Sequence, residues 1–149
     1  MIRSLRAFRR LPRAERRATV RAALTVARVE CALRRRPLPL VVEGLGFRLG
    51  DGPEGSETGE RPHLDEAERR RVRATRRVLG LSGRPQCLRT SLVLGHLLRD
   101  RAPILRIGVA PGADGVRAHA WLEIDGHVLD ASRADTSGFR LLTHAASGG

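Results

Sequence analysis

Apolar residues and arginines alternate through the first part of the chain at the spacing of an α-helix. Over residues 12–36 the apolar positions recur every three or four residues, and arginines fill the opposite positions. This pattern predicts one long helix with a buried stripe, which ends where Arg36 precedes a proline and is disfavoured in helical geometry. The stripe consists of Val20, Leu24, Ala27 and Cys31. Cys31 is therefore predicted to be a small buried hydrophobe.

A polar segment divides the chain after this helix. A short apolar stretch over residues 40–49 leads into residues 50–62, which are rich in glycine, proline and acidic residues and predict a loop or linker. Asp65 is then suited to cap a second helix that runs to about Leu79. The predicted organisation is a basic helical N-terminal segment (1–49), a flexible acidic loop (50–62) and a core (63–149).

A third helix is predicted from Pro85 to about Arg99, because proline suits the first position of a helix. Cys87 lies in its first turn. Leucines cover more than one face of this segment, which indicates a central, well-buried helix. They are Leu88, Leu92, Leu94, Leu97 and Leu98.

Beyond Pro103 the period of the pattern changes from that of a helix to that of a strand. Residues 111–115 have turn chemistry, and Asp125-Gly126 is a dipeptide favoured in two-residue hairpins. The predicted strands cover residues 105–109, 117–124, 127–131 and 139–142. Helices followed by an antiparallel meander predict an α+β fold, with the helix that carries Cys87 packed on the sheet.

The hairpin fixes which residues share a face of the sheet. With Asp125-Gly126 as the turn, Trp121 lies opposite Asp130, so His119 and Asp130 share a face as diagonal neighbours, about 7–8 Å apart. Glu123 lies about 13 Å along the strand from His119, and Asp125 about 20 Å. Asp130 is thus the carboxylate best placed to reach His119.

Cys87, His119 and Asp130 together have the chemistry of a nucleophilic cysteine site. The unpaired N–H groups and positive dipole end of a helix favour a thiolate at Cys87, His119 can hold the proton, and Asp130 can orient the ring. The residue types alone leave catalytic and structural interpretations open. The cysteines and histidines are scattered without metal-ligand spacing, so we expect no metal site.

The blocks that carry these residues resemble a known family. Cys87-Leu-Arg-Thr-Ser-Leu-Val-Leu-Gly-His-Leu-Leu-Arg and His119-Ala-Trp-Leu-Glu-Ile-Asp-Gly126 are similar to the transglutaminase-like cysteine peptidase core. In particular they resemble the lasso peptide biosynthesis B2 proteins, which are stand-alone leader peptidases. The similarity covers about residues 75–142 well and the N-terminal segment more loosely.

This resemblance implies a cysteine protease that removes the leader from a ribosomally made precursor peptide. A separate leader-binding B1-type protein would present the substrate, and a lasso cyclase would close the ring afterwards. Cys87 would be the nucleophile, His119 the base and Asp130 the orienting acid, with the backbone N–H of Cys87 as an oxyanion donor. A second oxyanion donor is not assigned, and no cofactor is implied.

The net charge of +12 is concentrated in the first third of the chain, where residues 1–48 hold 13 arginines against three glutamates. Such a segment suits nucleic acid, an anionic surface or an acidic partner, and a solvated helix face is the simpler interpretation. Zinc-finger spacing and aromatic RNA-binding strands are absent from the sequence, so nucleic acid is not expected. The candidate contacts with a protein partner are Arg9, Arg10, Arg13, Arg16 and Arg17.

The remaining composition limits the class of protein. The 149 residues contain no apolar run long enough to span a membrane and no signal-peptide pattern. Two cysteines do not make a disulfide framework, so we expect a reducing cytoplasm. Two alternatives stay open: an acyltransferase or deamidase that uses the same three residues, and a non-enzymatic arginine-rich module that binds nucleic acid.

Overall fold

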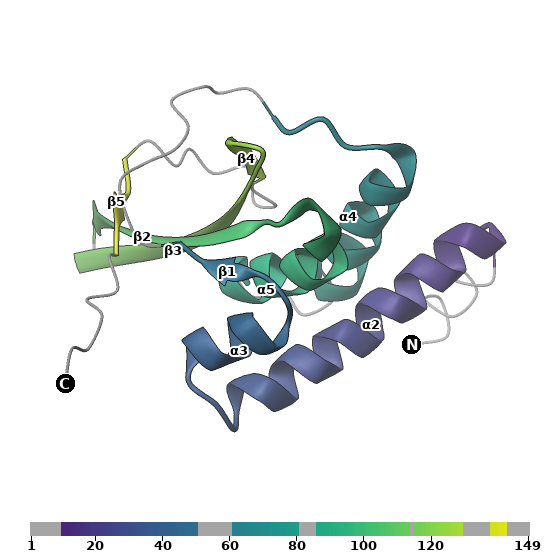
Figure 1. The fold of residues 1–149 in the computed structure, drawn as a ribbon, viewed down its shortest axis with the longest axis horizontal. Helices are drawn as coiled ribbons and strands as arrows, with labels where there is room; N and C mark the ends of the chain where they lie inside the picture. Colours follow the sequence, from purple (N-terminus) through teal and green to yellow (C-terminus); the bar gives the residue numbers. More distant parts are fainter. Residues whose placement is uncertain (1–9, 51–60, 81–85, 114, 130–137, 143–149) are drawn as a thin grey trace.

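Figure 1 shows the computed structural model of the chain, which describes residues 10–50, 61–80, 86–113, 115–129 and 138–142. These residues have the α+β fold that the sequence predicts. Four helices gather on one side of a twisted sheet, and the long N-terminal helix is the outermost of them (Figure 1). None of the helices in these ranges combines the length and apolar character needed to cross a bilayer.

The helices form largely where the sequence predicts them. They are α2 (Arg13–Leu33), α3 (Leu38–Gly44), α4 (Glu66–Leu79) and α5 (Cys87–Leu97), with the single-turn 3-10 helix η2 (Arg99–Arg101) after α5. At the start of α4 the Asp65 carboxylate accepts the Glu68 N–H, and the Glu68 carboxylate accepts the Asp65 N–H, at 2.7 and 2.8 Å. This reciprocal cap confirms the predicted helix start. The helical turns of α3 are not predicted from the short apolar stretch that forms them.

In the described part of the chain, two long and three short strands form one sheet. They are β1 (Arg48–Leu49), β2 (Ile104–Gly112), β3 (Gly115–Ile124), β4 (His127–Leu129) and β5 (Arg140–Leu141). Strands β2, β3 and β4 are antiparallel neighbours, whereas β1 pairs parallel to β2. β5 pairs antiparallel to the same edge of β2, further along that strand. The meander is as predicted, and the two-residue β1 is an addition that the pattern does not reveal.

The hairpin between β3 and β4 has the predicted register. Asp125 and Gly126 both have positive φ, 52° and 77°, as a two-residue turn of this hand requires. Ile124 lies opposite His127 and Leu122 opposite Leu129, as expected. The strand is described as far as Leu129, so Asp130 lies outside the described residues. The other predicted turn is shorter than expected, because pairing between β2 and β3 continues to Gly112 and Gly115.

The buried face of α2 is different from the one that the apolar spacing predicts. The residues that pack inward are Ala22, Thr25 and Val29, each less than 9% exposed. The predicted stripe faces solvent instead: Val20 is 49% and Leu24 67% exposed, and Cys31 is also exposed. The prediction of a buried Cys31 is therefore wrong. Small residues on the inner face let α2 approach α4 and α5 closely.

Two apolar clusters lie on the two faces of the sheet. The larger one joins the helices to the face of β3 that carries Ala120, Leu122 and Ile124. The smaller one lies on the opposite face and contains Ala110, Trp121 and Phe139. Both faces of β3 are therefore buried near its centre, although the sequence indicates a single apolar face.

Candidate active site

Cys87 lies in the first turn of α5, as predicted, although the helix begins at Cys87 itself and not near Pro85. Its side chain is half-buried at the edge of the larger apolar cluster. The N-cap residue Gln86 supplies no side-chain hydrogen bond to the helix. The N–H groups of the first turn have no acceptor within the helix itself. Together with the dipole they create a positive potential beside the thiol, which suits a thiolate and an oxyanion.

Two contacts fix how α5 lies on β3. Ser91 Oγ donates a hydrogen bond of 3.1 Å to the carbonyl oxygen of Ala120. Further along the chain, Arg101 in η2 pairs with Asp125, just past the end of β3. The helix and the strand therefore run in the same direction, and the start of α5 lies toward the start of β3.

This direction places Cys87 beside the middle of β3. Cys87 precedes Ser91 by four residues, so it lies on the same side of the helix and about 6 Å nearer its start. Two residues of strand span about the same distance, so this end of α5 lies toward Ala118, the neighbour of His119 in the chain.

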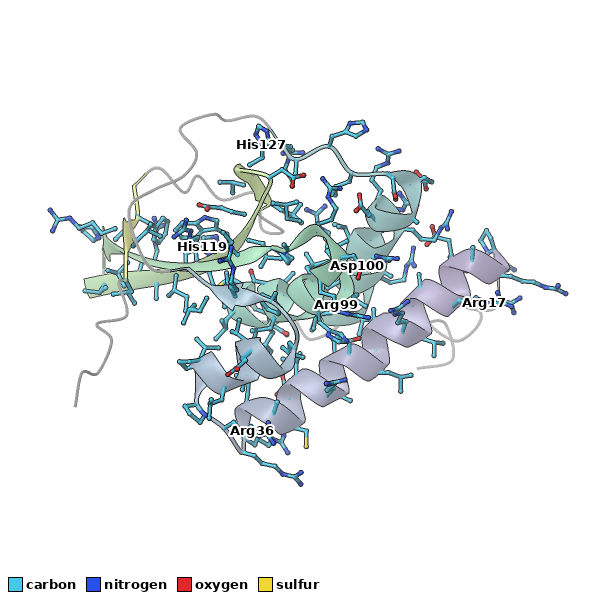
Figure 2. All side chains as sticks on the ribbon, in the orientation of Figure 1. Arg17, Arg36, Arg99, Asp100, His119 and His127 are labelled. Carbon is cyan, nitrogen blue, oxygen red and sulfur yellow. The ribbon has the colours of Figure 1, made fainter. Side chains whose placement is uncertain are left out.

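The imidazole of His119 is held between aromatic rings. Its centroid lies 5.9 Å from that of Trp121 and 5.4 Å from that of Phe139, and His119 is only 8% exposed. The guanidinium carbon of Arg117 lies 5.3 Å from the centre of the Phe139 ring on its other flank. This packing restricts the ring to few orientations, which is the preorganisation a catalytic base needs. Figure 2 shows His119 on the sheet, well away from Arg17 and Arg36 at the two ends of α2.

A glycine makes room for this aromatic cluster. Gly108 lies opposite His119 in the register of β2 and β3. A Cβ at Gly108 would lie 2.8 Å from Phe139 and 2.9 Å from Trp121, which is closer than van der Waals contact allows. The glycine inside an otherwise apolar strand is the sequence signal for this close approach. Neither the cluster nor its dependence on Gly108 is predicted from the sequence.

The thiol and the imidazole start from opposite faces of the sheet. Cys87 packs with the helix-covered face, whereas His119 lies with the Trp121 cluster.

The two rival carboxylates near His119 have other partners. Glu123 is buried and accepts a hydrogen bond of 2.9 Å from Nε of Arg106 on the neighbouring strand. Asp125 pairs with Arg101 at the turn. Neither carboxylate is available to orient His119, so the elimination made from the sequence gains support. Within the described ranges, no three His, Cys, Asp or Glu side chains are close enough to hold a metal ion.

The arginines proposed as partner contacts lie around the start of α2. Arg13, Arg16 and Arg17 belong to its first two turns, Arg10 precedes it, and Arg9 lies outside the described residues. Among the ion pairs formed between described residues, none involves these side chains. A positive charge near a helix N-terminus opposes the helix dipole and destabilises the helix slightly. Their position is thus unfavourable for the stability of α2.

Comparison with known proteins gives one match. The model of a family described as the transglutaminase-like superfamily matches residues 1–144, nearly the whole chain. No curated protein and no solved structure matches the chain. The matched range includes α2 together with Cys87 and His119.

Proposed function

Because the chain belongs to the transglutaminase-like superfamily, we propose that it is a cysteine peptidase that removes the leader from a lasso peptide precursor. Activity of the cysteine peptidase or acyltransferase type is what the family suggests. The observation that carries the proposal is that Cys87 begins a helix packed on the strand that carries His119, a histidine clamped by aromatic rings. The blocks around these two residues, which resemble the B2 leader peptidases, support the finer assignment.

The proposed reaction proceeds through a thioester. Cys87 Sγ attacks the carbonyl carbon of the last leader residue, and His119 takes the thiol proton. The carbon–nitrogen bond breaks, and His119 gives that proton to the amine of the core peptide. Water then attacks the thioester with His119 as base, which releases the leader as a carboxylic acid and restores the thiol. The N–H groups at the start of α5, including that of Cys87, stabilise the oxyanion in both steps.

Asp130 is proposed as the residue that orients His119. The described register of β3 and β4 ends with Leu122 opposite Leu129, and the same register continued by one step would put Asp130 opposite Trp121 and diagonal to His119. A carboxylate there would hold the imidazole in the tautomer that accepts the thiol proton. The engagement of Glu123 and Asp125 with arginines supports this choice.

The start of α2 is proposed as the contact with the leader-binding protein and, through it, with the precursor and the cyclase. The arginines there add charge where the helix dipole disfavours it, which is consistent with selection for binding rather than for stability. A partner that holds the precursor near Cys87 would raise the rate mainly by proximity. An acidic surface on that partner would meet Arg10, Arg13, Arg16 and Arg17.

The proposal predicts that genes for a short precursor peptide and a leader-binding protein lie beside this one. The test is cleavage of that precursor with and without the leader-binding protein, followed by mass spectrometry. Cys87→Ala should abolish cleavage and leave the fold intact. Asp130→Asn should slow cleavage by at least about 10²-fold, because the imidazolium loses its orienting charge. Asp125→Asn is the matched control and should stay close to wild type, since asparagine also suits the turn.

Each outcome separates the proposal from its rivals. Cleavage by Cys87→Ala would contradict the peptidase mechanism. A product in which an added amine is joined to the leader would indicate acyl transfer in place of hydrolysis. Salt-sensitive binding to nucleic acid without capture of the partner would favour the arginine-rich module.

A further inference from the structure

Beyond the start of α5, no helix of the described residues covers the face of the sheet on which α5 packs. The register places Val109 opposite Ala118 and Pro111 opposite Val116, so all four side chains lie on the face that α5 covers further along β3. Leu142, which follows β5 and donates its N–H to the Ile107 carbonyl oxygen at 2.8 Å, extends this face across β2. We call the surface formed by these residues the apolar shelf. Its members are Ile107, Val109, Pro111, Val116, Ala118 and Leu142.

The shelf is unusually exposed for an apolar surface. Val116 is 79% and Leu142 51% exposed, and Pro111 and Ala118 are also exposed. The shelf residues are apolar, and one charged residue, Arg140, shares their face, opposite Val109 and two residues before Leu142. A contiguous apolar patch left in water is a common mark of a binding surface.

The shelf begins beside the first residue of α5, where the helix no longer covers the sheet. This end of α5 lies toward Ala118, so the thiol stands at the boundary between the covered part of β3 and the shelf. Ala120, two residues further along, is already buried beneath Ser91. A peptide whose carbonyl group lies at Cys87 therefore has this surface directly beside it.

We propose that the shelf binds the substrate peptide next to the bond that is cut and selects an apolar side chain there. This inference rests on the proposed function, because it takes the substrate to be a peptide attacked by Cys87. An extended peptide directs alternate side chains to one face, so one side chain near the reacting carbonyl lies on Val116 and Ala118. Burial of that side chain gives binding energy, and a charged side chain at this position is disfavoured because it would lose water.

The kinetic test uses the precursor peptide and variants of the shelf. Val116→Asp and Leu142→Asp should each lower kcat/KM for cleavage by roughly tenfold. The matched control is Leu40→Asp, since Leu40 on α3 has the same 51% exposure as Leu142 and lies off the shelf. Its kcat/KM should equal that of the wild type. The rate at which iodoacetamide alkylates Cys87 should be the same in all variants, because this reagent does not need the shelf.

A binding test separates this inference from the proposed function. Methyl resonances of the Cys87→Ala protein are followed by NMR while the uncut precursor is added. Shifts confined to Val109, Val116 and Leu142, with Leu40 unchanged, support the shelf even if the wild type cuts nothing, in which case only the proposed function fails. Cleavage with wild-type kcat/KM by both aspartate variants, or binding that leaves the shelf methyls unmoved, would overturn the shelf and leave the peptidase standing.

Discussion

The two helices that carry the cysteines, α2 and α5, pack against each other and are stabilised in different ways. In α5 nearly every residue from Ser91 to Leu97 is buried, and the helix is covered on several sides. In α2, nearly twice as long, the buried residues are three small ones. The comparison teaches that a long arginine-rich helix can join the fold without a broad apolar face.

Ion pairs add to the apolar contacts of α2, in which partly buried residues such as Val26 and Leu33 also pack against the core. Glu15 pairs with Arg73 at 3.0 Å and with Arg77 at 3.4 Å, both on α4. Near the other end of α2, Glu30 pairs with Arg89 on α5. These two carboxylates hold α2 against its neighbours along its length, whereas α5 depends on hydrophobic burial.

The largest predicted difference between the helices is in how much the free energy of unfolding falls when a buried side chain is truncated. Leu92→Ala in α5 should lower the free energy of unfolding by about 3 kcal/mol, since Leu92 is fully buried and its loss leaves a cavity. Val29→Ala in α2 should cost about 1 kcal/mol, because fewer atoms are removed. Urea unfolding followed by circular dichroism measures both. Equal losses of unfolding free energy in the two variants would mean that α2 contributes to the core as much as α5 does.

A smaller effect is predicted for the ion pairs of α2. Hydrogen bonds from Arg73 and Arg77 hold the pKa of Glu15 below its ordinary value. The charged form thus stabilises the folded state above the unfolded pKa, and this contribution is lost as the pH falls through the folded pKa. Glu15→Gln should cost about 1 kcal/mol at neutral pH and nothing once the wild-type carboxyl is protonated.

The measurement for Glu15 is the urea midpoint of wild type and variant over the acidic range. The two curves should converge as the pH falls, and added salt should narrow the gap at neutral pH. Glu43→Gln is the control, because Glu43 is in none of the ion pairs formed among the described residues. Curves for Glu15→Gln that stay parallel to wild type would contradict the role assigned to this carboxylate.

The smallest effect is predicted on the outer face of α2. Leu24→Ser should change the free energy of unfolding by less than about 0.5 kcal/mol, since Leu24 is 67% exposed. Thr25→Leu, one residue away on the buried face, should destabilise by overpacking. Thermal unfolding of the two variants gives the comparison. A large loss of stability in Leu24→Ser would mean that the buried face of α2 is the one that the apolar spacing predicts.

The same contrast explains what the sequence could predict. The hairpin at Asp125-Gly126, the capped start of α4 and the position of Cys87 at a helix start all follow from local chemistry, because turns, caps and helix ends depend on neighbours in the chain. The register that puts Leu122 opposite Leu129 follows from the hairpin in turn. These features carry most of the candidate site.

The face of α2 could not be predicted in this way. Apolar residues occur on both of its faces: Leu24 is 67% exposed, whereas Leu33 packs against the core. Which face of α2 is buried depends on residues distant in the sequence, such as Arg73 and Arg77, which form ion pairs with Glu15. The packing of Phe139 on His119 depends likewise on a strand pairing that no local pattern encodes.

The two cysteines permit one direct test of the central claim, that Cys87 is an activated nucleophile. Cys31 on α2 is the more exposed thiol and serves as an internal reference. Iodoacetamide at mildly acidic pH reacts with thiolates, and mass spectrometry of the two cysteine peptides over time gives both rates. Access alone favours the more exposed Cys31, so faster alkylation of Cys87 reports activation. We predict that Cys87 is alkylated faster than Cys31, and that His119→Gln removes the difference. Faster alkylation of Cys31 at every pH, in line with its exposure, would contradict the account.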